Sequence, residues 1–283
     1  MNKNIPVMIL AGGFGTRLRE ETEFKPKPMV QIGGKPILWH IMKIYSHYGF
    51  SKFIVCLGYK GSYIKDYFKH FHLQGVDVTV DTKTGRMVSH QQNDEDWEVT
   101  LVETGQNCFT GGRVARAAKY VDSDTFMLTY GDGLSDVNIT KLLEFHNSHG
   151  KLATLTGAKN PFRFGNLKLD GQKVDEFVEK KDFGDSWING GFFVLNKEFL
   201  KYLSTDSKCV LEKQPLSLAA KDGNLMVYKH AGFWQCMDTL RDHESLQKLW
   251  KIGAPWKVWD YVDQDKMSFP SPRIDLGSLL KTE

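Results

Sequence analysis

A glycine-rich segment directly follows the first apolar run of the chain. Its sequence is Leu-Ala-Gly-Gly-Phe-Gly-Thr-Arg-Leu, over residues 10–18. Glycines let the backbone approach an anion closely, and successive backbone N–H groups can form a concave anion site. Thr16 adds a hydroxyl and Arg17 a fork of donors that suits a phosphate. The segment therefore predicts a phosphate-binding loop, with a tight turn between strand and helix as the alternative.

Two common phosphate-binding motifs do not fit this loop. The dinucleotide motif G-x-G-x-x-G would place a glycine where the chain has Leu18, and a Walker P-loop would end in Gly-Lys-Ser/Thr. A second basic cluster follows at residues 25–29, Lys-Pro-Lys-Pro-Met. Because proline favours an extended backbone, we expect Lys25 and Lys27 to be held in fixed positions. A lysine held near a triphosphate would stabilise charge on the reacting phosphorus.

Two aspartates are candidate metal ligands. Asp132 lies between two glycines after a predicted strand, and open α/β sheets bind ligands at the carboxyl ends of their strands. Asp238 lies in Cys-Met-Asp-Thr at residues 236–239. Two carboxylates together with phosphate oxygens suit Mg²⁺, which keeps several waters. Taken alone, each aspartate is also compatible with a turn residue or a helix cap.

Alternating strand and helix patterns must position these groups. Apolar runs predict buried strands at residues 5–10, 53–57, 125–129 and 153–156, with further strands at 79–80 and 99–102. Helical spacing predicts helices over residues 36–48, 62–70, 111–120 and 139–149. This alternation is typical of a parallel sheet with helices on both faces. Short strands around 167–169, 174–178 and 191–195 predict a smaller antiparallel extension.

Composition excludes several other classes. The 283 residues are 41% hydrophobic and 25% charged, which is ordinary for a globular chain. The net charge of +3 is too small to require a nucleic-acid partner. No apolar run reaches the roughly 18 residues of a membrane helix, and the first is too short for a signal peptide. The four cysteines are far apart, which argues against a zinc or disulfide framework. We therefore expect a cytoplasmic protein without a membrane partner.

The order of these motifs resembles the sugar-1-phosphate nucleotidylyltransferases. The resemblance rests on residues 10–18, 25–29 and 33–38, and further segments resemble its cytidylyl branch, at residues 38–43, 110–113, 129–133, 188–194 and 232–242. It extends from about residue 5 to 260 and implies an α/β fold with a mixed, mainly parallel, Rossmann-like sheet flanked by helices. We expect one domain over residues 1–261, with a nucleotide half to about 135 and a sugar-phosphate half from about 136. The tail, 262–283, has no predicted role.

The resemblance also implies roles for individual residues. Catalytic roles fall on Arg17, Lys27, Asp132 and Lys180, and Mg²⁺ would bind Asp132 and Asp238. Contacts to the nucleotide fall on Leu10, Ala11, Gly12, Gly13, Gly15, Thr16, Arg17, Lys27, Thr110, Gly111, Arg113 and Gly131. Contacts to the sugar phosphate fall on Gly165, Glu179, Lys180, Asn189 and Gly190. Residues 110–113 open a predicted helix, whose N–H groups could face the ligand. Lys181 replaces a proline that many members carry, which weakens the case for a rigid loop there.

The implied reaction is nucleotidyl transfer from CTP to α-D-glucose 1-phosphate, by a homo-oligomer such as a hexamer. The attacking phosphate is already an anion, so positioning and charge neutralisation would suffice for catalysis. Three alternatives stay open: UTP or dTTP as the nucleotide, another phosphate as the acceptor, and a non-catalytic nucleotide-sugar-binding protein. The last would be expected to have lost a lysine or an aspartate, yet all five predicted charged groups are present: Arg17, Lys27, Asp132, Lys180 and Asp238.

Overall fold

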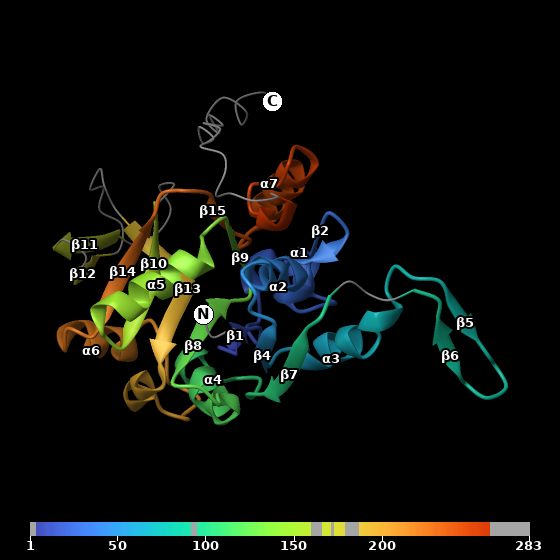
Figure 1. The fold of residues 1–283 in the computed structure, drawn as a ribbon, viewed down its shortest axis with the longest axis horizontal. Helices are drawn as coiled ribbons and strands as arrows, with labels where there is room; N and C mark the ends of the chain where they lie inside the picture. The colour runs from blue at the N-terminus through green and yellow to red at the C-terminus, as the bar shows by residue number, and fades with distance from the viewer. Residues whose placement is uncertain (1–3, 92–94, 160–165, 171–172, 179–186, 261–283) are drawn as a thin grey trace.

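A nine-stranded sheet forms the centre of the computed structural model, which describes residues 4–91, 95–159, 166–170, 173–178 and 187–260 (Figure 1). Its strands are β1 (Val7–Leu10), β4 (Lys52–Leu57), β7 (Glu98–Glu103), β8 (Thr125–Tyr130), β10 (Ala153–Lys159), β11 (Asn166–Asp170), β12 (Lys173–Val178), β13 (Trp187–Asn196) and β14 (Leu225–His230). Strands β7, β4, β1 and β8 lie side by side and are parallel. The carboxyl ends of these four strands therefore share one edge, as the sequence predicted.

Strand β13 joins the two halves of the chain. It pairs antiparallel with β8 on one side, with Phe192 opposite Thr129, and antiparallel with β10 on the other. Strand β10 in turn pairs with β14 in parallel, and β11 and β12 form an antiparallel extension. The expected mixed, mainly parallel sheet with a smaller antiparallel extension is confirmed.

Helices cover both faces of the sheet. They are α1 (Arg19–Thr22), α2 (Ile37–His47), α3 (Gly61–Lys69), α4 (Thr110–Ala117), α5 (Ile139–His149), α6 (Gln214–Lys221) and α7 (Leu240–Lys251). Single 3₁₀ turns span Thr16–Leu18, Lys27–Met29, Phe71–Leu73, Ala118–Tyr120 and Val258–Asp260, and a longer one spans Lys197–Tyr202. Among the residues described, no helix is long and apolar enough to cross a bilayer.

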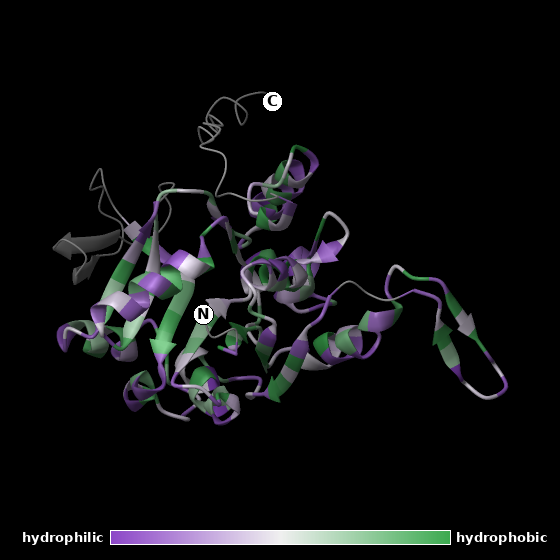
Figure 2. Cartoon of the chain, in the orientation of Figure 1, coloured by the Kyte–Doolittle hydropathy of each residue, from purple (hydrophilic) through white to green (hydrophobic). Residues whose placement is uncertain are grey.

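Alternate residues of the central strands β1, β4, β8 and β13 enter two separate cores. Val7 and Ile9 of β1 pack with residues of α2, α5 and α7, whereas Met8 and Leu10 pack with residues of α4 and α6. A strand buried on both faces must be apolar throughout, which is why β1 has an uninterrupted apolar sequence. Figure 2 shows the same contrast, with mostly hydrophobic central strands and helices that alternate between polar and apolar residues.

Small sheets and one projecting hairpin complete the fold. The short strands are β2 (Gln31–Ile32), β3 (Lys35–Pro36), β5 (Val78–Val80), β6 (Met87–Ser89), β9 (Gly133–Ser135) and β15 (Trp234–Cys236). The expected strand at 79–80 exists, but it pairs with β6 outside the central sheet and projects from the body of the molecule (Figure 1). The predicted helices agree with α2, α3, α4 and α5 to within a few residues. Helix α7 and strand β14 were not predicted.

Candidate active site

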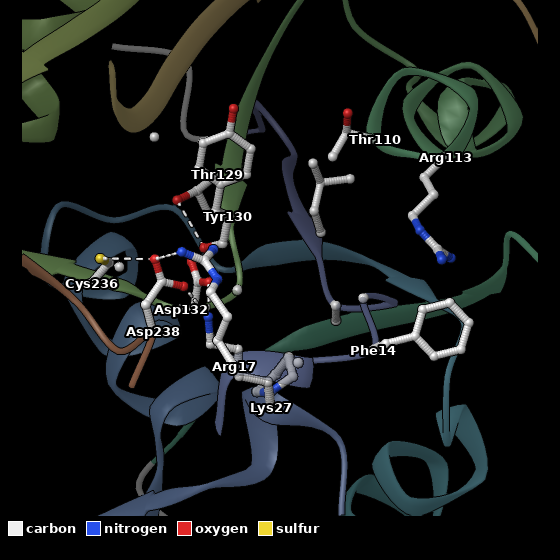
Figure 3. Close-up of a pocket in the computed structure, with 18 of the residues that line it drawn as sticks. Phe14, Arg17, Lys27, Thr110, Arg113, Thr129, Tyr130, Asp132, Cys236 and Asp238 are labelled. Carbon is white, nitrogen blue, oxygen red and sulfur yellow. Dashed lines mark hydrogen bonds and ion pairs between the residues drawn. The ribbon is translucent and has the colours of Figure 1, made fainter. Parts of the chain in front are cut away.

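A cleft of about 860 Å³ opens beyond the carboxyl ends of β1 and β8 (Figure 3). Its walls come from the glycine-rich loop after β1, the start of α4, the end of β8 and the middle of β13, together with the segment between β15 and α7. These elements are far apart in the sequence. The parallel strand order brings their ends together, as expected for a binding site in an open α/β sheet.

The glycine-rich loop turns sharply at Gly15. This residue has a φ of +64°, and a β-carbon there would lie 2.8 Å from Cγ2 of Thr22. A 3₁₀ turn over Thr16–Leu18 follows and points Arg17 toward the cleft (Figure 3). Glycine at position 15 is therefore required by both the backbone conformation and the close packing.

Arg113 supports this loop through a hydrogen bond to its backbone. The residue is 4% exposed, and its guanidinium donates hydrogen bonds to the carbonyl oxygens of Gly12 (2.8 Å) and Leu57 (2.9 Å) and to Oγ1 of Thr104 (2.8 Å). A β-carbon on Gly12 would lie 2.2 Å from Nη1 of Arg113, so glycine makes room for the guanidinium. Arg113 thus fixes the shape of the loop; its direct contact with a nucleotide stays a prediction.

Lys27 lies between the two predicted metal-binding aspartates. Its Nζ is 2.6 Å from Oδ2 of Asp132 and 2.6 Å from Oδ1 of Asp238. Arg17 reaches the other oxygen of Asp238, with Nη1 at 2.9 Å from Oδ2. The expected extended segment is wrong in part: Pro26 is extended, but Lys27–Met29 forms a 3₁₀ turn. This turn directs Lys27 toward the two aspartates. Lys25 instead forms an ion pair with Glu21, with 3.0 Å between Nζ and Oε2.

The start of helix α7 places Asp238 in the cleft. Thr239, not Asp238, is the N-cap of α7, and it forms a capping box with Asp242. Oδ2 of Asp242 also accepts a hydrogen bond from the backbone N–H of Asp238, at 3.2 Å. Because the cap is supplied by its neighbours, the carboxylate of Asp238 remains available to Lys27 and Arg17. The helix-cap interpretation of Asp238 is therefore wrong, and its role as a metal ligand stays a prediction.

The charges in this cluster shift one another's pKa values. Burial acts to lower the pKa of Lys27, but the Asp132 and Asp238 carboxylates outweigh it and raise the pKa above its ordinary value. Burial acts to raise the pKa of Asp238, and Lys27 and Arg17 overcome it and lower the pKa. At neutral pH, Lys27 is therefore a cation and Asp238 an anion.

The two aspartates fit a hard divalent cation. Both carboxylates already contact a single positive group, the Lys27 ammonium, at 2.6 Å each. No cluster of three or more His, Cys, Asp or Glu side chains suited to a metal occurs in the part of the chain that the structure describes. Two carboxylates with water and phosphate oxygens completing the shell are typical of a Mg²⁺ site that forms with its substrate.

The opposite wall of the cleft carries neutral polar groups. Nδ2 of Asn189 donates to the hydroxyl of Tyr130 at 3.0 Å, and Nε1 of Trp234 donates to the carbonyl oxygen of Gly190 at 2.7 Å. Trp234 packs against one of the two cores and also lines the cleft. Sequence reasoning missed Glu212, which accepts hydrogen bonds from Tyr130 and Thr110. No motif marks Glu212, because it lies in an irregular segment before α6.

Most of the predicted site residues come together around the cleft. Those that line it are Leu10, Ala11, Gly13, Gly15, Thr16, Arg17, Lys27, Thr110, Arg113, Gly131, Asp132, Asn189, Gly190 and Asp238. Gly12 and Gly111 do not line it: Gly12 lies against Arg113, and Gly111 lies against Cys209. The N–H of Gly112 donates to the Cys209 carbonyl, so this part of the α4 N-terminus faces protein. Gly165, Glu179, Lys180 and Lys181 lie outside the described residues.

Comparison with known proteins gives consistent matches across the chain. A family model described as "Nucleotidyl transferase" matches residues 6–239. A glucose-1-phosphate cytidylyltransferase from Salmonella typhi is 51% identical over 255 residues, covering 89% of this chain and 99% of that protein. A probable glucose-1-phosphate cytidylyltransferase from Bacillus subtilis (strain 168) is 45% identical over 253 residues, with the same coverage. Among solved structures, UTP-bound UGPase from Acinetobacter baumannii has a TM-score of 0.69 at 17% identity, covering 90% of this chain and 96% of that chain.

Proposed function

The chain belongs to the nucleotidyl transferase family, and from this premise we propose that it transfers the cytidylyl group of CTP to α-D-glucose 1-phosphate, giving CDP-glucose and pyrophosphate. The observation that carries the proposal is Lys27, which lies between Asp132 and Asp238 beside the glycine-rich loop. This arrangement supports the proposal, because three charged side chains line the same cleft as the predicted phosphate-binding loop. The 51% identity to a curated cytidylyltransferase supports CTP and glucose 1-phosphate as the substrates.

The chain's own residues would work by positioning and charge neutralisation. Backbone N–H groups of the loop and the guanidinium of Arg17 would bind the β- and γ-phosphates. Lys27 would stabilise the negative charge that develops at the α-phosphorus. The phosphate oxygen of the sugar attacks that phosphorus, the bond to the β-phosphate oxygen breaks, and pyrophosphate leaves. The nucleophile is an anion, so no side chain need remove a proton.

A divalent metal is typical of this family, and we infer that Mg²⁺ binds Asp132 and Asp238 and neutralises phosphate charge. Lys180 and Glu179, outside the described residues, are proposed to bind the sugar phosphate. We also infer a homo-oligomer, on the resemblance to the family alone.

Pyrophosphate release tests the reaction directly. The purified chain is incubated with Mg²⁺ and glucose 1-phosphate, and CTP, UTP, dTTP, ATP and GTP are compared in parallel. Release with CTP at least about tenfold faster than with the others is the expected result. Faster release with another nucleotide would keep the mechanism and contradict the cytidylyl assignment. No release with any nucleotide would contradict the reaction itself.

A further inference from the structure

Glu212 connects two residues that line the cleft on different elements. It lies in the segment before α6 and does not itself line the cleft. Its Oε1 accepts a hydrogen bond from the hydroxyl of Tyr130 and its Oε2 accepts one from Oγ1 of Thr110, both at 2.6 Å. Tyr130 and Thr110 both line the cleft. One carboxylate therefore holds a hydroxyl group at each of two positions in the site.

These hydrogen bonds have a fixed direction. A carboxylate can only accept, so the single proton of the Tyr130 hydroxyl points toward Glu212. The Tyr130 oxygen must then accept from its other neighbour, Nδ2 of Asn189, at 3.0 Å. The oxygen of that amide, Oδ1, accepts a hydrogen bond from the backbone N–H of Gly191 at 2.9 Å. The amide of Asn189 is thus oriented at both ends, and the contacts between described residues leave one N–H and one lone pair for a ligand.

Packing holds the Tyr130 ring at the centre of this network. The ring meets Phe193 edge-on, with centroids 5.8 Å apart. On another side it lies against Gly191, where a β-carbon would come within 2.5 Å of Cδ2 of Tyr130. Since the ring cannot shift easily, the orientation of its hydroxyl proton depends on Glu212.

We propose that Glu212 is a positioning residue for the sugar-phosphate subsite, acting through Tyr130 to orient the amide of Asn189. This rests on the proposed function and on the predicted contact of Asn189 with the acceptor sugar. Reversal of the amide would present a donor where the sugar needs an acceptor, and an acceptor where it needs a donor. Glu212 would therefore affect the binding of glucose 1-phosphate without touching it.

Glu212→Gln tests this with little change in shape. The glutamine amide can accept from only one of the two hydroxyls and must donate to the other, so the direction of the network changes at Tyr130 or at Thr110. We expect the KM for glucose 1-phosphate to rise about tenfold, as for one misdirected hydrogen bond, with kcat changed less than about twofold. Tyr130→Phe, which keeps the ring packing, should give a similar rise. The double variant should be no worse than either single one.

Glu198→Gln is the matched control, because Glu198 is an exposed glutamate paired with Lys201 and does not line the cleft. Glu198→Gln should leave the KM for CTP and the KM for glucose 1-phosphate unchanged. A lower kcat with unchanged KM in Glu212→Gln would indicate only a loss of folded enzyme and would overturn the proposal. If the unaltered chain proves inactive, the proposed function fails separately. The side-chain amide NMR signals of Asn189 then decide, since unchanged signals in Glu212→Gln would contradict the orienting role.

Discussion

At the scale of single residues, Lys27 has the most informative position. Its ammonium is the positive charge between Asp132 and Asp238, and its side chain is only 12% exposed. We expect Lys27→Met to reduce kcat by about two to three orders of magnitude, because charge stabilisation at the reacting phosphorus is lost. Lys25→Met is the matched control, because Lys25 lies two residues from Lys27 but forms its ion pair with Glu21. It should retain activity within about threefold; equal losses in both variants would contradict the specific role of Lys27.

The same variant tests the metal site without any turnover. Removal of the ammonium leaves Asp132 and Asp238 facing each other, and two nearby carboxylates repel. We expect the Tm of Lys27→Met to fall by about 5 °C in EDTA. Added Mg²⁺ should restore more of the Tm in the variant than it adds to the unaltered protein, because the cation binds between the carboxylates. Thermal unfolding with and without Mg²⁺ measures this, and equal shifts in both proteins would exclude these aspartates as the ligands.

At the scale of elements, the capping box of α7 connects helix stability to the site. Asp242 caps the helix and accepts from the backbone N–H of Asp238. We expect Asp242→Ala to lower stability by about 1 kcal/mol and to raise the Mg²⁺ concentration needed for half-maximal rate about threefold. Asn138→Ala removes the N-cap of α5, whose Oδ1 accepts from the N–H of Lys141 at 2.9 Å. It should lower stability similarly and leave the Mg²⁺ dependence unchanged.

His40 connects α2 to the segment at residues 254–260 and makes this contact sensitive to pH. Its Nε2 donates to the Ile32 carbonyl at 2.9 Å, and its Nδ1 accepts from Trp256 at 3.4 Å. Burial lowers the pKa of His40 to about 4 from 6.5. The unfolded chain therefore binds this proton first, and the stabilisation present above pH 6.5 is lost as the pH falls toward 4. The loss is at most about 3 kcal/mol.

The pH dependence of unfolding in His40→Leu checks this. The variant should be less stable at pH 7.5, since two hydrogen bonds are lost, but its stability should decline less between pH 6.5 and 4.5. Other buried histidines, such as His146, also have lowered pKa values, so some decline will remain. His72→Gln, at an exposed position, should follow the unaltered protein. A decline in His40→Leu as steep as in the unaltered chain would contradict the assignment.

The elements also show what could be predicted from the sequence. Strands β1, β4 and β8 are largely apolar runs that a glycine follows within two residues, and the buried face of α2 is mostly apolar, so local pattern was sufficient. The motifs around Asp132 and Asp238 marked both carboxylates as site residues. They did not predict that Lys27 forms an ion pair with each of them. Glu212 could not be predicted, because its role arises only when β8, α4 and the segment before α6 meet. Helix α7 was missed because it is strongly polar, with only Leu246 and Leu249 buried.

At the scale of the whole molecule, the two predicted halves share both cores. One core includes both Ile5, near the start of the chain, and Val258, near the end of the described residues. The other includes Met8 of β1 and Val227 of β14. Strand β13, from the second half, pairs directly with β8 of the first. Division near residue 135 would expose the edge of β8 and split both cores. The proposed boundary between a nucleotide half and a sugar-phosphate half is therefore expected to describe function and not independent folding.

Cooperative unfolding follows from this shared core. Far-UV circular dichroism reports the loss of helices and strands throughout, whereas fluorescence is weighted to the region where Trp256, fully buried, packs with Trp250 near His40 of α2. If the halves fold as one unit, both signals should give the same urea midpoint and a single transition. Trp256→Ala should shift both midpoints together, by the equivalent of about 3–5 kcal/mol for a buried aromatic side chain. A fluorescence transition that precedes the dichroism change would instead show that residues 254–260 separate first, and that the sheet alone joins the two halves.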